Sequence, residues 1–173
     1  MKLVLDIETD GLDPTCIHVA VCKNIESGEV TSFREWDKVF FQSYLNKADQ
    51  VIMHNGISFD LPILERLWGI SFPYTKVLDT LVISQLHNPI RDGGNGLQNW
   101  GNILGFPKDE KPVSFKEFTT QMHNYCVRDV EVTEKVYHKL RSDMKGWSKR
   151  SVDLEHTVRR CLLYTSPSPR DRT

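Results

Sequence analysis

The chain opens with a short apolar run, Leu3-Val4-Leu5-Asp6-Ile7-Glu8, that carries two acids at alternate positions. Aliphatic and β-branched residues in such a run predict a β-strand. Side chains two residues apart on a strand point to the same face of the sheet, so Asp6 and Glu8 are expected to lie together. Paired carboxylates repel each other and are costly to bury unless a cation lies between them. An edge strand with a solvated acidic face explains the pair equally well.

The pattern of the whole chain indicates an α/β fold. Strands are predicted at 17–22, 30–33 and 51–53, with an extended piece at 77–78, and helices at 36–45, 61–68, 80–86 and 97–104. A further helix is expected to start near Phe115, because Ser114 and Glu117 have the spacing of a capping box. Helical spacing then predicts one long buried helix face, made of Cys126, Val130, Thr133, Tyr137 and Leu140. Antiparallel strands followed by alternating helices and strands predict a mixed central sheet.

Composition and charge exclude several other classes of protein. Of the 173 residues, 39% are hydrophobic and 26% are charged, which is typical of a globular domain and excludes a disordered or fibrous chain. The net charge of −1 excludes a protein that holds nucleic acid through a strongly basic surface alone. No apolar stretch is long enough to span a membrane, and the acidic N-terminus argues against a signal peptide, so a cytoplasmic location is expected. The four cysteines lack the spacing of a zinc site or a disulfide framework.

A second polar cluster, His54-Asn55-Gly56-Ile57-Ser58-Phe59-Asp60, follows directly on the strand at 51–53. Polar residues at the end of a strand that leads into a helix are where α/β proteins place ligands. Asp60 precedes the helix expected from Leu61, and on its own it is best explained as an ordinary N-cap. This motif therefore supports a site only in combination with others.

A third motif, Tyr125-Cys126-Val127-Arg128-Asp129, lies on the predicted long helix. Residues four apart share a helix face, so the Tyr125 hydroxyl and the Asp129 carboxylate can address one site. The alternative is an aspartate on the helix surface that pairs with Arg128 or a lysine, beside a tyrosine that only packs. Taken alone, this motif is weak evidence.

In this order, DxE at 6–8, HNxxxFD at 54–60 and YxxxD at 125–129 resemble the DEDD superfamily of 3′–5′ exonucleases. Tyr125 marks the tyrosine-type branch, because the histidine-type branch would place His where this chain has Asn124. The fragments DIETDGL, HNGISFDLPIL, LDTLVISQL, LQNWGNILG and YCVRDVEVTEKVYHKL resemble more narrowly the exonuclease domain of family A replicative DNA polymerases of tailed bacteriophages. The resemblance implies a ribonuclease-H-like fold, with a mixed central sheet, an antiparallel three-stranded meander at its start and helices on both faces.

The resemblance also implies a two-metal-ion 3′–5′ exonuclease that removes 3′-terminal nucleotides from single-stranded or frayed DNA, with Mg²⁺ or Mn²⁺ as the two ions. In that family Asp6 would bridge both ions, and Glu8 and Asp129 would complete the tighter site. Asp60 would hold the second ion through water, and Tyr125 would orient the attacking water. All four acids and the tyrosine are present in this chain.

Contacts to the substrate follow from the same resemblance. Leu12 corresponds to an apolar wedge against the terminal bases, although a buried loop leucine explains it nearly as well. His54 and Asn55 are candidate contacts to the terminal nucleotide. Lys108, Lys111 and Arg91 could touch the backbone of the strand, but scattered basic residues are more often mere surface residues, and we interpret them so.

Two alternative functions stay open at this point, a free-standing 3′–5′ exoribonuclease similar to ribonuclease D and a catalytically silent nucleic-acid-binding domain. We expect residues 1–148 to form the exonuclease domain and 149–160 to begin a polymerase domain, the partner in cis. No other protein partner can be deduced. The segment 161–173 contains CLLYTSPSPRD, which resembles the translation of a sequencing-library adapter, so the natural chain is expected to continue differently after Arg160. A phage-encoded enzyme would act in the cytoplasm of the infected bacterium.

Overall fold

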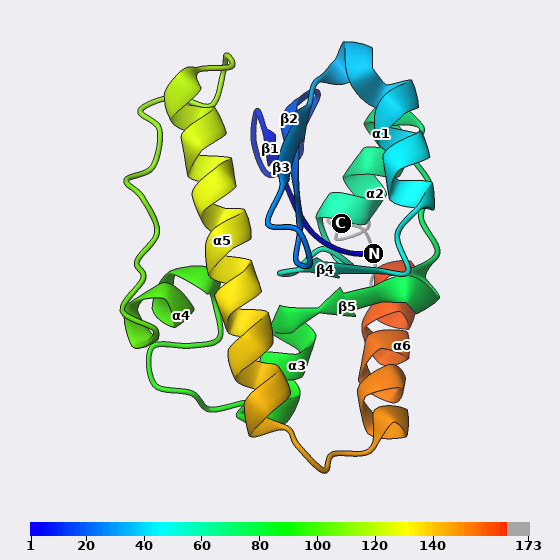
Figure 1. Ribbon diagram of the computed structural model, residues 1–173, viewed down its shortest axis with the longest axis vertical. Helices are drawn as coiled ribbons and strands as arrows, with labels where there is room; N and C mark the ends of the chain where they lie inside the picture. The colour runs from blue at the N-terminus through cyan, green and yellow to red at the C-terminus, as the bar shows by residue number, and fades with distance from the viewer. Residues whose placement is uncertain (166–173) are drawn as a thin grey trace, which may run out of the picture.

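Five strands form one mixed sheet in a computed structural model that describes residues 1–165 (Figure 1). The order across the sheet is β3-β2-β1-β4-β5. The strands are β1 (Lys2–Thr9), β2 (Ile17–Asn24), β3 (Val30–Phe33), β4 (Gln50–Met53) and β5 (Val77–Asp79). Neighbours among β1, β2 and β3 pair antiparallel, whereas β4 pairs parallel with β1 and β5 pairs parallel with β4. The predicted mixed sheet with its antiparallel meander is confirmed.

Helices cover both faces of this sheet. They are α1 (Lys38–Asn46), α2 (Asp60–Ile63), α3 (Thr80–His87), α4 (Leu97–Ile103), α5 (Thr120–Asp143) and α6 (Lys149–Thr165). The 3₁₀ turn η1 (Glu35–Asp37) leads into α1, the π-helical turn η2 (Leu64–Trp68) continues α2, and the 3₁₀ turn η3 (Tyr74–Lys76) precedes β5. Helices α1 and α2 lie against one face of the sheet and α5 lies along the other (Figure 1). The predicted arrangement of helices on both faces is confirmed.

Strand β1 lies in the middle of the sheet, and the alternation of its side chains decides which residue meets which helix. Its odd-numbered apolar residues pack with α1 and α2 in one hydrophobic cluster. Val4 belongs to a second cluster on the opposite face, together with Val130 of α5. Because side chains alternate along a strand, Asp6 and Glu8 share the face of Val4 and point toward α5. The contact between β1 and α5 is therefore apolar at Val4 and acidic at Asp6 and Glu8.

Helix α5 carries the predicted buried face. All five residues of the predicted stripe are buried, namely Cys126, Val130, Thr133, Tyr137 and Leu140. The helix begins at Thr120, after the N-cap Thr119, whose Oγ1 accepts a hydrogen bond from the Met122 N–H at 3.1 Å. The predicted start near Phe115 is wrong, because Ser114 Oγ accepts the nearby Lys116 N–H at 3.2 Å in a local turn that competes with a helix.

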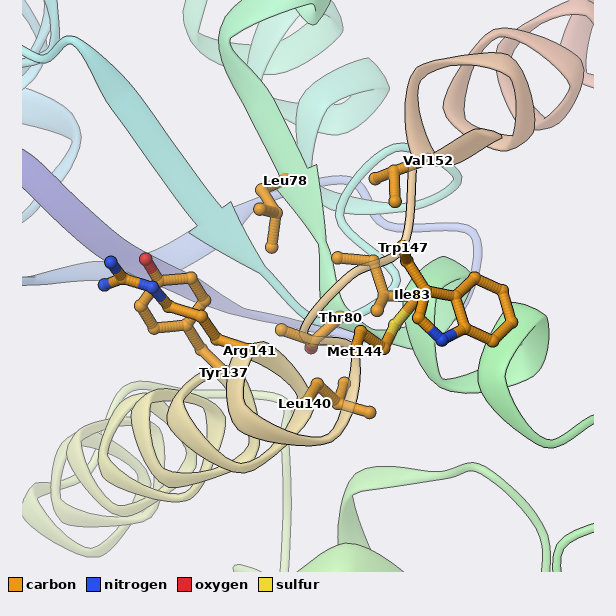
Figure 2. A pocket seen from close by; sticks show the side chains of 9 residues that line it. All are labelled: Leu78, Thr80, Ile83, Tyr137, Leu140, Arg141, Met144, Trp147 and Val152. Carbon is orange, nitrogen blue, oxygen red and sulfur yellow. The ribbon is translucent and has the colours of Figure 1, made fainter. Parts of the chain in front are cut away.

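Helix α6 packs where β5 leads into α3, at the lower end of the view in Figure 1. His156 Nε2 accepts the backbone N–H of Asp79 at 2.8 Å, and His156 Nδ1 donates to the Val152 carbonyl oxygen at 2.7 Å. A mostly apolar pocket of about 240 Å³ lies beside this contact, at the C-terminal end of α5 (Figure 2). Its lining consists of Leu78, Thr80, Ile83, Tyr137, Leu140, Arg141, Met144, Trp147 and Val152.

None of the helices within residues 1–165 combines the length and the apolar character that a membrane span requires. Of the segment interpreted as adapter-derived, residues 161–165 belong to α6, and residues 166–173 lie outside the described part of the chain.

Gly101 of α4 allows the segment after this helix to approach it closely. A Cβ atom at this position would lie 2.9 Å from the Phe106 carbonyl oxygen and 3.2 Å from Pro107 Cα. Because backbone atoms cannot rotate away, we expect Gly101→Ala to lower the free energy of unfolding by about 1–3 kcal/mol, as measured by chemical denaturation. Gly11→Ala is the control, since a Cβ there meets nothing within 4 Å. Equal stability of the two variants would contradict this prediction.

Candidate active site

Asp6 and Glu8 leave β1 on the face that α5 covers. Because β1 is a central strand and Glu8 is only 8% exposed, the alternative of a solvated edge strand is wrong. The Cys126 thiol of α5 lies 3.5 Å from Asp6 Oδ2 and 3.6 Å from the Asp6 carbonyl oxygen. One ligand atom from each of Asp6, Glu8 and Cys126 lies within 4.8 Å of the other two. This spacing is short enough for a single metal ion to contact more than one of them.

Asp60 is the first residue of α2 and is almost completely buried. The N-cap position belongs to Phe59, so the interpretation of Asp60 as an ordinary N-cap is wrong. Burial raises the pKa of Asp60 to about 8, and the charge of Asp79 adds to the rise. Burial and then repulsion from Asp60 hold the pKa of Asp6 well above its usual range. Asp60 therefore belongs to the same acidic cluster as Asp6.

Tyr125 and Asp129 lie one turn apart on α5, and both are buried. Asp129 Oδ2 forms an ion pair with Lys108 Nζ at 2.5 Å. The other oxygen, Asp129 Oδ1, is buried and has no hydrogen-bond partner within residues 1–165. Asp129 is thus paired with a lysine, as the alternative interpretation allowed, but it lies in the interior and not on a solvated helix face.

The carboxylates of this cluster destabilise one another's charged forms. Burial raises the pKa of Glu8 to about 9, and repulsion from Asp6 and Asp129 adds to the rise. Burial also raises the pKa of Asp129 to about 6, although the Lys108 ammonium opposes the rise. A bound cation is what stabilises buried acids of this kind. Carboxylate oxygens are the ligands of hard divalent ions such as Mg²⁺, and the unpartnered Asp129 Oδ1 fits that role.

Lys108 and Cys126 are two of the site residues that sequence reasoning missed. The interpretation of Lys108 as a surface residue is wrong, because its side chain is 13% exposed and its Nζ lies 4.6 Å from the centroid of the Tyr125 ring. No sequence signal marks Lys108, which lies in an irregular segment between α4 and α5. Cys126 was assigned only to the buried helix face. Its position next to Tyr125 in the YxxxD motif is the sequence signal that could have identified it, because this turn of α5 faces Asp6.

The loop after β4, which carries His54 and Asn55, is held by Asp79 at the end of β5. Asp79 Oδ1 accepts the Asn55 N–H at 2.9 Å, and Asp79 Oδ2 accepts the Ile57 N–H at 3.1 Å. These bonds support the left-handed backbone of Asn55, whose φ is 68°. His54 Nδ1 lies 2.8 Å from Thr80 Oγ1, and burial lowers the pKa of His54 to about 4, so its ring is neutral near pH 7. Both residues therefore shape this loop, and Asp79 is the anchor that sequence reasoning missed.

Leu12 lies in the loop between β1 and β2, and its side chain is 93% exposed. The Asp10 carboxylate fixes this loop by accepting the backbone N–H groups of Thr15 at 2.8 Å and Cys16 at 3.1 Å. The alternative of a buried loop leucine is wrong. An exposed leucine on a fixed loop, four residues after Glu8, is available for contact with a ligand.

Known sequences that resemble this chain identify its superfamily. A model of the RNase_H superfamily matches residues 3–120. The DNA-directed DNA polymerases of Enterobacteria phage T3 and Escherichia phage T7 are 29% and 28% identical to the chain over 190 aligned positions, which cover 82% of this chain. The chain spans only 27% of the length of either polymerase. The predicted resemblance to phage DNA polymerases is confirmed.

Comparison with solved structures shows the same fold. NrnC of Brucella melitensis with bound Mg²⁺ has a TM-score of 0.71 at 18% identity, over 99% of this chain and 90% of that chain. The same values hold for NrnC bound to pGG. The family B DNA polymerase from the hyperthermophilic archaeon Pyrobaculum calidifontis has a TM-score of 0.61 at 14% identity, over 94% of this chain and 28% of that chain. The predicted ribonuclease-H-like fold is confirmed.

The metal-free protein should lose stability as the pH rises. Glu8 and Asp60 have folded-state pKa values of about 9 and about 8, whereas unfolded carboxyl groups titrate near pH 4. The folded state therefore binds more protons than the unfolded state between these values. The resulting stabilisation is full below about pH 4 and is lost as the pH rises through the folded-state pKa values. We expect the Tm in EDTA to fall from about pH 5 to about pH 9. The fall should be smaller in a parallel series with excess Mg²⁺ in place of EDTA. A Tm that rises over this window in EDTA would contradict the assignment.

Proposed function

The chain belongs to the RNase_H superfamily, and we propose that it is a metal-dependent 3′–5′ exonuclease that removes 3′-terminal nucleotides from single-stranded or frayed DNA. One observation carries the proposal: four acids, of which Glu8, Asp60 and Asp129 are buried and Asp6 is half-buried, cluster with a buried tyrosine in a chain similar to phage DNA polymerases. Uncompensated charges in an interior destabilise a protein relative to apolar residues of similar size. The acids are therefore best explained by the ions that they bind.

The donor set of the site suits two divalent ions, Mg²⁺ or Mn²⁺. Asp6, Glu8 and Asp129 would hold the first ion, and Asp60 would hold the second together with Asp6. Such ions supply a nucleophile from bound water near neutral pH and neutralise charge on the phosphate group. The Cys126 thiol, 3.5 Å from Asp6 Oδ2, would help to keep the Asp6 carboxylate in place as a metal ligand.

Tyr125 is the residue that we assign to the attacking water. Its ring is fixed by an edge-on contact with Phe115, with ring centroids 6.5 Å apart. Burial raises the pKa of Tyr125, so its hydroxyl stays protonated and neutral near pH 7. In this form it can hydrogen-bond to a water molecule. One turn along the helix, Asp129 faces the same site. Attack in line with the terminal phosphodiester would release the 3′-terminal nucleotide as a monophosphate.

The exposed Leu12 is our candidate for the contact that separates terminal bases. An apolar side chain inserted between bases unstacks them, and Leu12 is exposed on a fixed loop that follows the strand of Asp6 and Glu8. The loop of His54 and Asn55, at the end of β4, would contact the terminal nucleotide. With a net charge of −1, the chain would bind nucleic acid weakly through its own surface, which favours frayed 3′ ends over paired ones.

DNA is our preferred substrate because the similar polymerases of phages T3 and T7 are DNA polymerases. On the same relationship we propose a polymerase domain in cis, for which residues 149–160 would form the beginning, and action in the cytoplasm of an infected bacterium. A free-standing exoribonuclease is the second candidate. The matched fold covers 90% of the NrnC chain, so a protein can consist almost entirely of this fold. Labelled RNA and DNA strands of equal sequence, digested side by side, separate the two candidates.

We expect Asp6→Ala combined with Glu8→Ala to reduce Mg²⁺-dependent nucleotide release from a 5′-labelled single strand by more than about a hundredfold, because the shared ligand of the ions is lost. Gel analysis of the shortened products measures the rate. Asp153→Ala combined with Glu155→Ala is a matched control, since the same DxE spacing lies on α6, outside the acidic cluster. Retained activity in the first double variant would refute the proposed site.

Leu12→Ala is expected to slow nucleotide release from a matched duplex end by about threefold to tenfold while leaving release from a single strand nearly unchanged, because only the duplex must be unstacked. Single-turnover digestion of the two substrates measures the ratio. Leu154→Ala, at a leucine of α6 that is 59% exposed, is the control. An equal loss on both substrates would refute the role of Leu12 in separating bases.

A further inference from the structure

A lysine ammonium group lies inside the acidic site, and the nuclease chemistry proposed above assigns it no task. Lys108 Nζ is 2.5 Å from Asp129 Oδ2 and 4.6 Å from the centroid of the Tyr125 ring. Burial raises the pKa of both Asp6 and Glu8, and the charge of Lys108 opposes the rise in each case. This one ammonium therefore acts on three of the four acids.

The segment that carries Lys108 is fixed immediately before it. The Phe106 N–H donates to the Gly101 carbonyl oxygen at 2.8 Å, and the Pro107 carbonyl oxygen accepts from Arg128 Nε at 2.9 Å. The Arg128 guanidinium also stacks on the Phe106 ring, 3.3 Å from its centroid. Lys108 thus extends into the site from a backbone that α4 and α5 hold in place, and its contact with Asp129 is part of the fold.

We propose that Lys108 is a resident counter-ion of the acidic site, which a divalent ion displaces from Asp129 when it binds. The proposal rests on the metal-dependent function proposed above. Lys108 occupies one oxygen of Asp129 in a short, charge-assisted hydrogen bond. A metal ion on the same carboxylate would lie close to the ammonium, and two cations so placed repel each other strongly where water is excluded. Asp129 therefore holds one of them at a time.

Lys108 is accordingly a positioning residue. It holds Asp129 and the Tyr125 ring in place while no ion is bound, and it limits the number of uncompensated charges in the interior. An ion on the unpartnered Asp129 Oδ1 would lie beside the ammonium on Oδ2 and displace it by repulsion, so binding becomes an exchange of cations. The affinity of the site for a divalent ion is then lower than the four carboxylates alone would give.

Lys108→Met tests this exchange, because methionine keeps an unbranched side chain and removes the charge. We expect the variant to bind Mn²⁺ at least about tenfold more tightly than the unsubstituted chain, in calorimetric titrations without nucleic acid. Lys116→Met is the matched control, since Lys116 is an exposed lysine of the same segment, and it should leave the Mn²⁺ affinity unchanged. Equal or weaker binding of Mn²⁺ by Lys108→Met would overturn the proposal.

A second measurement uses the unsubstituted chain, so it does not depend on the folding of a variant. NMR of the lysine ammonium groups should show the Lys108 signal shift and exchange faster with solvent as Mg²⁺ is added, because the ammonium loses Asp129 as its partner. A Lys108 signal that stays unchanged at saturating Mg²⁺ would overturn the proposal. Failure of the unsubstituted chain to bind Mn²⁺ at all would instead contradict the proposed function, so the two failures are distinguishable.

Discussion

Burial of like charges at the contact between β1 and α5 is the constraint on which the rest of the structure depends. Asp6 and Glu8 lie on the face of the sheet that α5 covers, where Val4 makes an ordinary apolar contact. Asp129 and Asp60 come to the same place from α5 and from the start of α2. Such a cluster is unfavourable in an apolar interior unless cations or protons compensate it. The fold therefore holds an arrangement that needs bound cations or protons to be fully stable.

The scaffold distributes the parts of this site over elements that are rigid for independent reasons. The β1 strand is buried between two hydrophobic clusters, and α5 is anchored by the apolar stripe that continues away from the acids toward Leu140. Asp79 fixes the loop between β4 and α2 through the backbone of Asn55 and Ile57. The segment before α5 delivers Lys108. Charged groups on separate elements are thus kept close by packing that does not involve them.

Much of this arrangement could be predicted from the sequence, because periodic patterns carry it. The alternation in β1 places Asp6 beside Glu8, and the spacing of four on α5 places Tyr125 beside Asp129. Long-range contacts could not be predicted in the same way. The Phe115 carbonyl oxygen, for example, lies 2.8 Å from His18 Nε2 on β2, a contact that holds in an irregular conformation a segment whose local pattern favours a helix. Irregular segments carry no period, which is why Lys108 was assigned to the surface.

Calorimetric titration of the metal-free protein with Mn²⁺ near pH 7 tests most directly whether the clustered acids form a site for divalent ions. Titrations in two buffers of different ionisation enthalpy report how many protons binding releases. Since Glu8 and Asp60 have pKa values of about 9 and about 8, both carry protons before the ion binds. The predicted result is saturable binding accompanied by proton release. Absence of saturable binding, or binding that releases no protons, would contradict the account.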